Sequence, residues 1–338
     1  MLLDALNRPV KDLRISVTDR CNFRCTYCMP FDEYDEWIDR RELLSYEEIT
    51  RLAAIFLELG AEKIRLTGGE PLVRKDLDHL IVRLSALPGL RDLCLTTNGA
   101  LLVERSPALK AAGLRRINVS LDSLDQEKFR KITQRGNLQA VLEGLDAAKR
   151  AGFERIKINA VIERGVNDDE ILPLVEFARA NRFAVRFIEF MDVGNSNSWT
   201  FDKVVPKKEI IEKISARYPL AQKGREDGSA PSMDYRFEDG AGDIGVIASV
   251  TEPFCGDCTR ARVTADGKIV TCLFSQTGHD IKSLLRGGVS DAELKKKIAS
   301  IWQTRTDRYS EERLDAMRSG KGYQAKEHKK LEMIVLGG

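Results

Sequence analysis

The sequence lacks any apolar run that approaches the roughly 20 residues of a membrane-spanning helix, which excludes a protein that crosses the membrane through such helices. Its opening residues, MLLDALNRPVKDLR, are too polar and too short for a secretory signal. Internal repeats and low-complexity tracts are also missing, which excludes repeat architectures. We therefore expect a cytoplasmic protein with no membrane partner.

An excess of charge of either sign is missing as well. The 338 residues include 54 Lys and Arg and 52 Asp and Glu, which gives a net charge of +2. Because no overall field would attract nucleic acid, we predict no nucleic-acid partner. An anionic ligand would instead need a local cluster of basic side chains, so the placement of the charges matters more than their total.

The chain has only seven cysteines, and their clustering argues against a disulfide framework. One of them, Cys94, lies in the apolar run LCLTT and is predicted to be a buried thiol that packs as a small hydrophobe. The other six fall into two groups of three, namely Cys21, Cys25 and Cys28, and Cys255, Cys258 and Cys272.

Strand-like runs alternate with helical stretches from residue 13 to about residue 190, which predicts successive β/α units around a parallel sheet. In one helical stretch Ser45 and Glu48 form a capping pair at the start, and Gly60 follows the end. Six units predict an α/β fold, an incomplete (β/α)6 barrel similar to the TIM barrel. The strand-like runs are 13–18, 63–68, 93–98, 116–122, 156–162 and 185–190.

Several of these runs have one polar face, because side chains on a strand alternate between its two faces. Strands covered by helices on both sides would be nearly all apolar. We therefore expect a barrel interior that holds a polar ligand, and its lysines and arginines indicate an anionic one. The shared faces carry Arg14, Ser16 and Thr18; Lys63, Arg65 and Thr67; Asn118, Ser120 and Asp122; and Arg155, Lys157 and Asn159.

After residue 191 the pattern changes to loop-rich Gly, Asn and Asp segments, the second cysteine group and charged helical stretches. We predict two parts: a barrel over residues 1–190 and a C-terminal extension over residues 191–338. The closing Gly337 and Gly338 would, on their own, indicate a disordered tail.

The first cysteine group directly follows the first strand, at the mouth of the predicted barrel, where such folds keep their chemistry. Three thiolates leave one iron of a four-iron cluster open to a small chelating molecule, whereas structural zinc normally has four protein ligands. The alternative is a zinc site that a distant residue completes.

The second cysteine group also stops at three. Arg260 and Arg262 share one face of the strand-like run that follows Cys258, so both would lie beside the metal. This placement predicts a second open iron that faces a substrate. The alternative is a zinc site, with His279 close enough in sequence to be the fourth ligand.

The spacing C-x3-C-x2-C, with Tyr27 before its last cysteine, resembles the signature of the radical S-adenosylmethionine superfamily. The segment TGGEP at the end of the second strand resembles the part of these enzymes that receives the methionine amino group. Along nearly its whole length the chain is similar to the molybdenum-cofactor biosynthesis protein A family of GTP 3',8-cyclases. The matching segments are both cysteine groups, LRISVTDRCN, IRLTGGEPLVR, LTTNG, RINVSLDSL, RFIEFMDVGN and the terminal Gly-Gly.

This resemblance implies two [4Fe-4S] clusters, with S-adenosylmethionine on the first and GTP on the second. It assigns Tyr27, Gly69, Ser120 and Met191 to S-adenosylmethionine. It also implies that Gly337 and Gly338 form a catalytic tail that reaches the active site. The residues that it assigns to GTP are Arg14, Lys63, Arg65, Thr96, Lys157, Arg186, Arg260, Ala261 and Arg262.

In the implied reaction, a 5'-deoxyadenosyl radical takes the ribose 3' hydrogen of GTP, and the resulting carbon radical attacks carbon 8 of guanine. The resemblance also implies an electron donor and a hand-over of the product to cyclic pyranopterin monophosphate synthase. It leaves open whether the protein is a monomer or a homodimer. Two rivals are a radical enzyme that modifies a peptide and a zinc-stabilised protein that binds nucleic acid.

Overall fold

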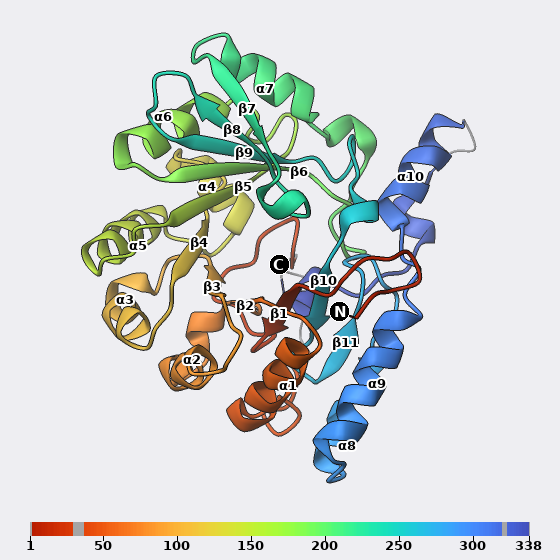
Figure 1. Ribbon diagram of the computed structural model, residues 1–338. Coiled ribbons are helices and arrows are strands. Elements are labelled where there is room, and N and C mark those ends of the chain that lie inside the picture. Colours follow the sequence, from red (N-terminus) through yellow and green to blue (C-terminus); the bar gives the residue numbers. More distant parts are fainter. Residues whose placement is uncertain (1, 30–36, 320–322, 338) are drawn as a thin grey trace.

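The computed structural model describes residues 2–29, 37–319 and 323–337. The six expected strands are present and lie side by side in chain order, all parallel. Figure 1 shows them curving in an arc with the helices on its outer side. The predicted α/β barrel is thus confirmed, with strands β1 (Asp12–Ser16), β2 (Lys63–Thr67), β3 (Asp92–Thr97), β4 (Arg116–Ser120), β5 (Ile156–Ile162) and β6 (Ala184–Glu189).

The helices bury one apolar stripe each against the outer face of this sheet. Helix α1 begins at the predicted capping box, in which Ser45 and Glu48 bond each other's backbone, and Gly60 follows its end with a φ of 115°. Its buried face includes Leu52 and Phe56, which join the main core with Leu13 of β1. The helices of this part are α1 (Tyr46–Glu58), α2 (Leu77–Ser85), α3 (Leu102–Ala111), α4 (Gln126–Thr133), α5 (Leu138–Arg150) and α6 (Ile171–Asn181).

The extension continues the barrel sheet at both of its edges. Strand β10 (Arg260–Val263) pairs in parallel with β1, and β9 (Asp243–Ile247) pairs in parallel with β6. Antiparallel strands follow outside them, in the order β12-β11-β10 on one side and β9-β8-β7 on the other. These strands are β7 (Leu220–Gly224), β8 (Met233–Phe237), β11 (Lys268–Val270) and β12 (His279–Asp280).

The sequence did not indicate this pairing, because short strands separated by loops carry no information about distant partners. The helices of the extension lie at both edges of the sheet (Figure 1). Helix α7 (Lys207–Ser215) lies near β7, whereas α8 (Lys282–Arg286), α9 (Asp291–Gln303) and α10 (Tyr309–Arg318) lie on the side of the β10 edge. The last helix is α11 (Met333–Leu336). Among the described residues, no helix is long and apolar enough to cross a membrane.

The structure differs from the predicted polar faces in the placement of one residue, Arg155. Arg155 precedes β5 and is exposed, so it is not part of the strand face that carries Lys157 and Asn159. The burial of β5 alternates strictly from Ile156 onward, which places Lys157 and Asn159 on the interior side. The strand itself begins at Ile156, as the predicted run 156–162 has it, and Arg155 lies in the connection between α5 and β5.

Helix α5 approaches the loop before α3 so closely that only glycine fits at one position. A Cβ atom on Gly144 would lie 2.3 Å from the backbone oxygen of Gly99. We predict that Gly144→Ala destabilises the protein by about 1–3 kcal/mol through overpacking, which outweighs a gain of roughly 1 kcal/mol in helix propensity. The urea midpoint of unfolding should fall, whereas Asp146→Ala on the exposed side of α5 should leave it nearly unchanged. Equal midpoints for the two variants would contradict this packing.

Candidate active site

Three arginines lie side by side across neighbouring strands of the barrel interior. Arg14 of β1 is in register with Arg65 of β2 on one side and with Arg262 of β10 on the other. Neighbouring strands are about 4.8 Å apart, so these side chains start from adjacent positions on one face. Like charges placed in this way repel each other. In the next row along the same strands, by contrast, Asp12 lies between cationic neighbours.

The charges of this arginine row are not neutralised within the part of the chain that the structure describes. No carboxylate there lies within 4.0 Å of Arg14, Arg65 or Arg262. Burial, followed by the charges of Arg262 and Arg65, lowers the pKa of Arg14 well below its usual value. Burial and neighbouring Arg260 lower the pKa of Arg262 to about 10. The row therefore calls for a ligand that carries several negative charges.

Hydrogen-bond donors around the arginine row are also left without partners. The Nε and Nη2 atoms of Arg262 and the Nε atom of Arg260 are buried and make no hydrogen bond. A buried donor without a partner costs about 1–3 kcal/mol, so such groups normally face a ligand. These donors mark the edge of a binding cavity rather than a packed core.

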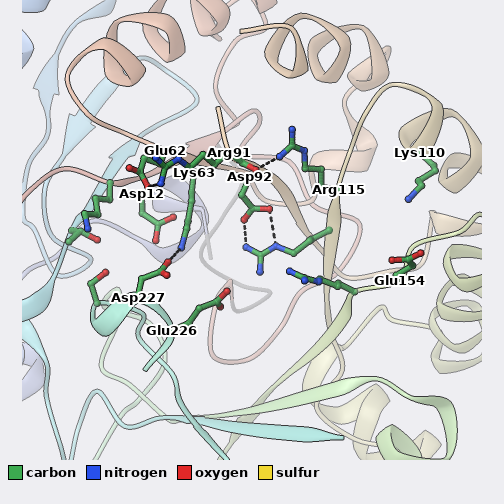
Figure 2. A pocket seen from close by; sticks show the side chains of 15 residues that line it. Asp12, Glu62, Lys63, Arg91, Asp92, Lys110, Arg115, Glu154, Glu226 and Asp227 are labelled. Carbon is green, nitrogen blue, oxygen red and sulfur yellow. Dashed lines mark hydrogen bonds and ion pairs between the residues drawn. The ribbon is translucent and has the colours of Figure 1, made fainter. Parts of the chain in front are cut away.

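A second set of cations in the interior is paired with carboxylates from the extension. Lys63 bonds Asp227 of the 3-10 turn η3 (Glu226–Gly228), as Figure 2 shows. Lys157 lies 3.8 Å from Glu226, and Arg186 lies 4.0 Å from the same carboxylate. The sequence did not indicate these carboxylates, because only the β9-β8-β7 arrangement brings them over the barrel.

Most residues predicted to bind GTP line one interior cavity, but two depart from that pattern. Lys157 lines an adjoining cavity. Glu226, which pairs with Arg186, lines both cavities. Ala261 is fully buried in the main core and does not line the central cavity. The predicted residues that line the central cavity are Arg14, Lys63, Arg65, Thr96, Arg186, Arg260 and Arg262, together with Met191 from the S-adenosylmethionine set.

Cys94 is buried as predicted, but its surroundings differ from those expected. Its thiol lies 3.3 Å from Nη1 of Arg65, which also donates to Thr96 Oγ1 at 3.2 Å. Strand alternation places Cys94 on the interior face with Thr96, whereas Leu93 and Leu95 face the helices. The thiol therefore packs beside the arginine row and not within the apolar layer.

The first cysteine group lies on the loop that leaves β1. Arg24 holds this loop by donating from Nη1 to the carbonyl of Cys21 at 2.7 Å. Burial is the main cause that raises the pKa of the Cys21, Cys25 and Cys28 thiols, to about 11 for Cys21. Neighbouring thiols of the group raise the pKa of Cys25 and Cys28 further. Three partly buried thiolates need a positively charged centre between them, which fits the donor set of an iron-sulfur cluster.

The TGGEP segment packs directly on the chain that leads to this loop. Cβ atoms on Gly68 and Gly69 would lie 2.6 Å from the Thr18 oxygen and 2.4 Å from the Arg20 oxygen, respectively. The glycines thus allow the chain itself to approach, in addition to any ligand. Glu70 is almost fully buried and accepts hydrogen bonds from three donors of two loops, namely Leu72 N, Thr97 Oγ1 and Asn98 N.

The residues assigned to S-adenosylmethionine come from this loop, from the end of β4 and from the segments that follow β2 and β6. The hydroxyl of Tyr27 donates to buried Asp122 at 2.7 Å, and Asp122 also accepts from Val161 N at 2.8 Å. Tyr27 and Met191 pack against the same small apolar cluster. Ser120 ends β4 on the interior side, in register with Asn159.

The second cysteine group lines a cavity of its own with Arg260 and Arg262. Two further buried arginines, which the sequence did not single out, hold its backbone. Arg8 donates to the carbonyl of Cys255 at 2.8 Å, and Arg305 donates to the carbonyl of Cys258 at 2.7 Å. Asp4 lies between these two guanidinium groups and bonds both. A pairing between residues about 300 positions apart leaves no local signal in a sequence.

The thiol of Cys258 fits a metal-bound thiolate. Burial raises its pKa, but the charges of Arg260 and Arg305 outweigh burial and lower it to about 6. His279, the ligand of the alternative zinc site, is exposed on β12. Within the described ranges, no group of three or more His, Cys, Asp and Glu is arranged to hold a metal ion. The donor set itself, three cysteines beside guanidinium groups with unpartnered N–H donors, fits a cluster with one open iron.

The closing glycines were predicted to reach the active site, and Gly337 lies in the barrel. A Cβ atom on Gly337 would be 2.3 Å from Cγ2 of Thr67 and 3.4 Å from Cβ of Ser16, the last residues of β2 and β1. The residue has a φ of 74°, which also favours glycine. Gly338 lies outside the described residues.

Comparison with known proteins finds two family models that match successive segments of the chain. The Radical SAM superfamily matches residues 15–178, and Molybdenum Cofactor Synthesis C matches residues 183–311. The GTP 3',8-cyclase of Xanthomonas axonopodis is 47% identical over 99% of this chain and 98% of that protein. The GTP 3',8-cyclase of Acidothermus cellulolyticus is 48% identical with the same coverage of each chain. This chain belongs to the GTP 3',8-cyclase family.

A solved structure supports the fold of this family member. Streptococcus suis SuiB bound to S-adenosylmethionine aligns with a TM-score of 0.60 over 87% of this chain and 68% of that one, at 17% identity. At this identity the likeness concerns the fold alone. The Staphylococcus aureus GTP 3',8-cyclase, by contrast, is 44% identical over 99% of this chain and 98% of its own length.

The two cysteine groups should bind separate clusters. We predict that reconstituted protein holds about eight irons per chain and that Cys25→Ser and Cys258→Ser each retain about four, because each removes one ligand of one cluster only. Cys94→Ala is the matched control and should keep about eight. Iron analysis and the electron paramagnetic resonance of the reduced protein measure the outcome. Full iron content in Cys258→Ser, or zinc in place of iron, would contradict the assignment.

Proposed function

We propose that this protein is the GTP 3',8-cyclase of molybdenum cofactor biosynthesis, which forms (8S)-3',8-cyclo-7,8-dihydroguanosine 5'-triphosphate. The observation that carries this proposal is the arginine row of Arg262, Arg14 and Arg65, which lies in a cavity lined also by Arg260 beside the second cysteine group. A nucleoside triphosphate supplies the negative charges that these side chains lack.

Cys21, Cys25 and Cys28 would hold one [4Fe-4S] cluster, and Cys255, Cys258 and Cys272 the other. When bound, the first cluster would supply one electron to S-adenosylmethionine, whose carbon–sulfur bond would break to give methionine and the 5'-deoxyadenosyl radical that removes the ribose 3' hydrogen of GTP. Tyr27, Gly69, Ser120 and Met191 would bind S-adenosylmethionine. Arg24, whose guanidinium bonds the carbonyl of Cys21, keeps the cluster loop in place.

The cavity's own residues would bind and orient GTP. Arg14, Arg65 and Lys63 would bind phosphate oxygens, with Lys157 and Arg186 at the adjoining edge. When GTP binds, its phosphate groups would replace the carboxylates of Glu226 and Asp227 as partners of Lys63, Lys157 and Arg186. Arg260 and Arg262 would donate hydrogen bonds to the cyclised nucleotide and stabilise its charge during reduction. Thr96, the Ala261 backbone and the Gly337-Gly338 tail would complete the site.

The remaining features of this proposal concern partners and location. An electron donor would reduce the clusters, and the labile product would pass to cyclic pyranopterin monophosphate synthase. We place the protein in the cytoplasm, as a monomer or a homodimer. Residues 1–190 would act as the barrel unit and residues 191–338 as the extension that completes the site.

Production of 5'-deoxyadenosine should depend on GTP when reconstituted protein is incubated with S-adenosylmethionine and dithionite. We predict that Arg262→Ala keeps about eight irons but makes at least tenfold less cyclised product, because it removes a charge-assisted hydrogen bond worth about 1.5–3 kcal/mol. Arg217→Ala, on the exposed surface, is the control and should be fully active. Chromatography with mass detection measures both products.

Two outcomes would refute this assignment. If 5'-deoxyadenosine forms equally well without GTP, the substrate is wrong, and a peptide becomes the better candidate. If Arg262→Ala turns over normally, that residue has no role in the reaction.

The affinity for GTP should fall as the pH rises above about 8. Burial and the charge of Arg186 lower the pKa of Lys157 to about 8, so the free protein loses this positive charge above that pH. GTP binds the charged form, and each further pH unit should weaken binding by up to about tenfold. Lys157→Arg keeps its charge and should show a smaller increase in the dissociation constant between pH 8 and pH 9.5. Identical pH profiles would contradict a contact between Lys157 and GTP.

A further inference from the structure

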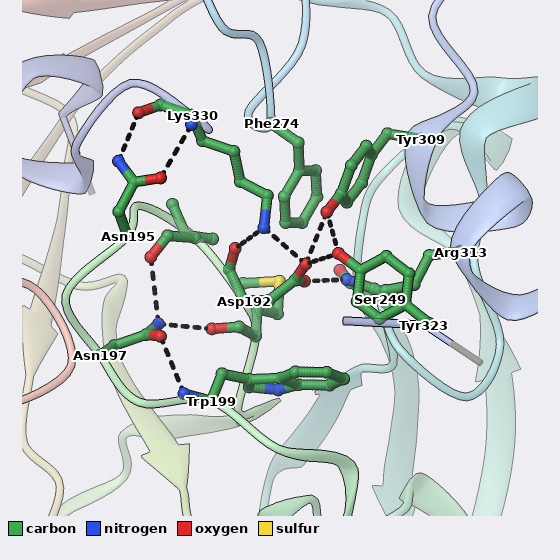
Figure 3. Close-up of polar contacts among 12 residues, drawn as sticks. Asp192, Asn195, Asn197, Trp199, Ser249, Phe274, Tyr309, Arg313, Tyr323 and Lys330 are labelled. Atoms are coloured by element: carbon green, nitrogen blue, oxygen red, sulfur yellow. Dashed lines mark hydrogen bonds and ion pairs between the residues drawn. The ribbon is translucent and has the colours of Figure 1, made fainter. Parts of the chain in front are cut away.

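Asp192 is a buried carboxylate for which the proposed reaction has no use. It directly follows Met191, and it lies between the barrel and the last described segment of the chain (Figure 3). Its Oδ1 atom accepts from Arg313 of α10, and its Oδ2 atom accepts from Lys330 at 2.8 Å and from Tyr309 at 2.7 Å.

The partners of this carboxylate are buried with it. Arg313 and Lys330 are each at most 4% exposed. Tyr323 also donates to Asp192, and its ring stacks on His328 at a centroid distance of 5.2 Å. Burial raises the pKa of Asp192, but the charges of Arg313 and Lys330 outweigh burial and lower it to about 2. Buried ion pairs contribute little net stability and are better at fixing one arrangement of a chain.

The arrangement that these contacts fix is the path of the C-terminal segment. Lys330 also donates to the backbone oxygen of Asp192 at 2.8 Å. The side chain of Asn195 then pairs with the Lys330 backbone, accepting from its N at 2.9 Å and donating to its O at 2.6 Å. Glu332 accepts from the Asn195 side chain at 2.7 Å. The loop that begins at Met191 therefore holds residues 330–332 at several points.

Directly after these contacts the segment enters the active site. Met333 lines the central cavity together with Met191 and the arginine row. Leu336 is fully buried against Val193, and Gly337 lies against Thr67 at the end of β2. The distance along the chain from the anchor at Lys330 to Gly337 is only seven residues. Movement of the anchor would thus displace everything that follows it.

We propose that Asp192, with Lys330 and Asn195, is a positioning clamp that holds the C-terminal tail in the cavity so that cleavage of S-adenosylmethionine stays coupled to cyclisation of GTP. This inference rests on the proposed function. Because the loop of the clamp starts at Met191, the clamp also joins the tail to a residue assigned to S-adenosylmethionine. Asp192 itself lines none of the catalytic cavity's described surface, so it acts through the tail.

The test uses full-length reconstituted protein with Asn195→Ala and Lys330→Met, and with Glu327→Ala as the matched control in the same segment. Asn195 and Glu327 are both exposed, so neither substitution should disturb the core. Hydrogen exchange of amides 331–337 should be at least tenfold faster in the two clamp variants. The ratio of 5'-deoxyadenosine to cyclised product should rise several-fold, while iron content and the affinity for S-adenosylmethionine stay at the wild-type values. Glu327→Ala should match the wild type in every readout.

A further variant, Asp192→Asn, is measured in the same way. If it fails to fold, the results for Asn195→Ala still decide whether the clamp exists. Faster exchange with an unchanged product ratio would overturn the proposed coupling, and so would unchanged exchange in both clamp variants. Failure of the proposed function is a separate result: wild-type protein would then make no cyclised product from GTP, while the exchange measurement would still test the clamp.

Discussion

The constraint on which the rest of the structure depends is the mutual repulsion of three arginines that share one face of a parallel sheet, because other parts of the fold must compensate for it. Arg262, Arg14 and Arg65 occupy adjacent register positions, and no described carboxylate neutralises them. Such a row is unfavourable in the free protein and favourable only with a polyanion bound. In the proposed function, the stability that this row costs the free protein is recovered when the triphosphate binds. The apolar outer layer, where Leu13 and Ile64 alternate with these cations, provides the stability that permits this row.

The arginine row also explains why the extension belongs to the same sheet as the barrel. Strand β10 adds to the β1 edge and thereby aligns Arg262 with Arg14, directly beyond Cys258. At the opposite edge β9 adds to β6, and the chain beside it brings Glu226 to Lys157 and Arg186. Some of the interior cations thus lack a carboxylate partner among the described residues, whereas Lys63, Lys157 and Arg186 are paired with carboxylates of the extension.

Buried carboxylates have a different task from these cations: they hold loops. Glu70 joins the loops after β2 and β3, beside the first cysteine group. Asp122 joins Tyr27 to the backbone of β5, and Asp192 joins the end of β6 to α10 and the tail. In each case a carboxylate accepts bonds from segments that are distant in sequence. Such contacts cost desolvation but allow few alternative arrangements, which suits a site that must exclude water.

The six barrel strands, most of their polar faces and the two cysteine groups could be predicted from the sequence, because alternation and spacing are local properties of the chain. It misplaced Arg155, which lies before β5 in the connection from α5. Three other features follow only from the tertiary contacts. They are the parallel pairing of β10 with β1 and of β9 with β6, the Arg8–Asp4–Arg305 group that holds the backbone of Cys255 and Cys258, and the Asp192 clamp. They join residues that lie far apart along the chain, and a single sequence carries no record of such distances.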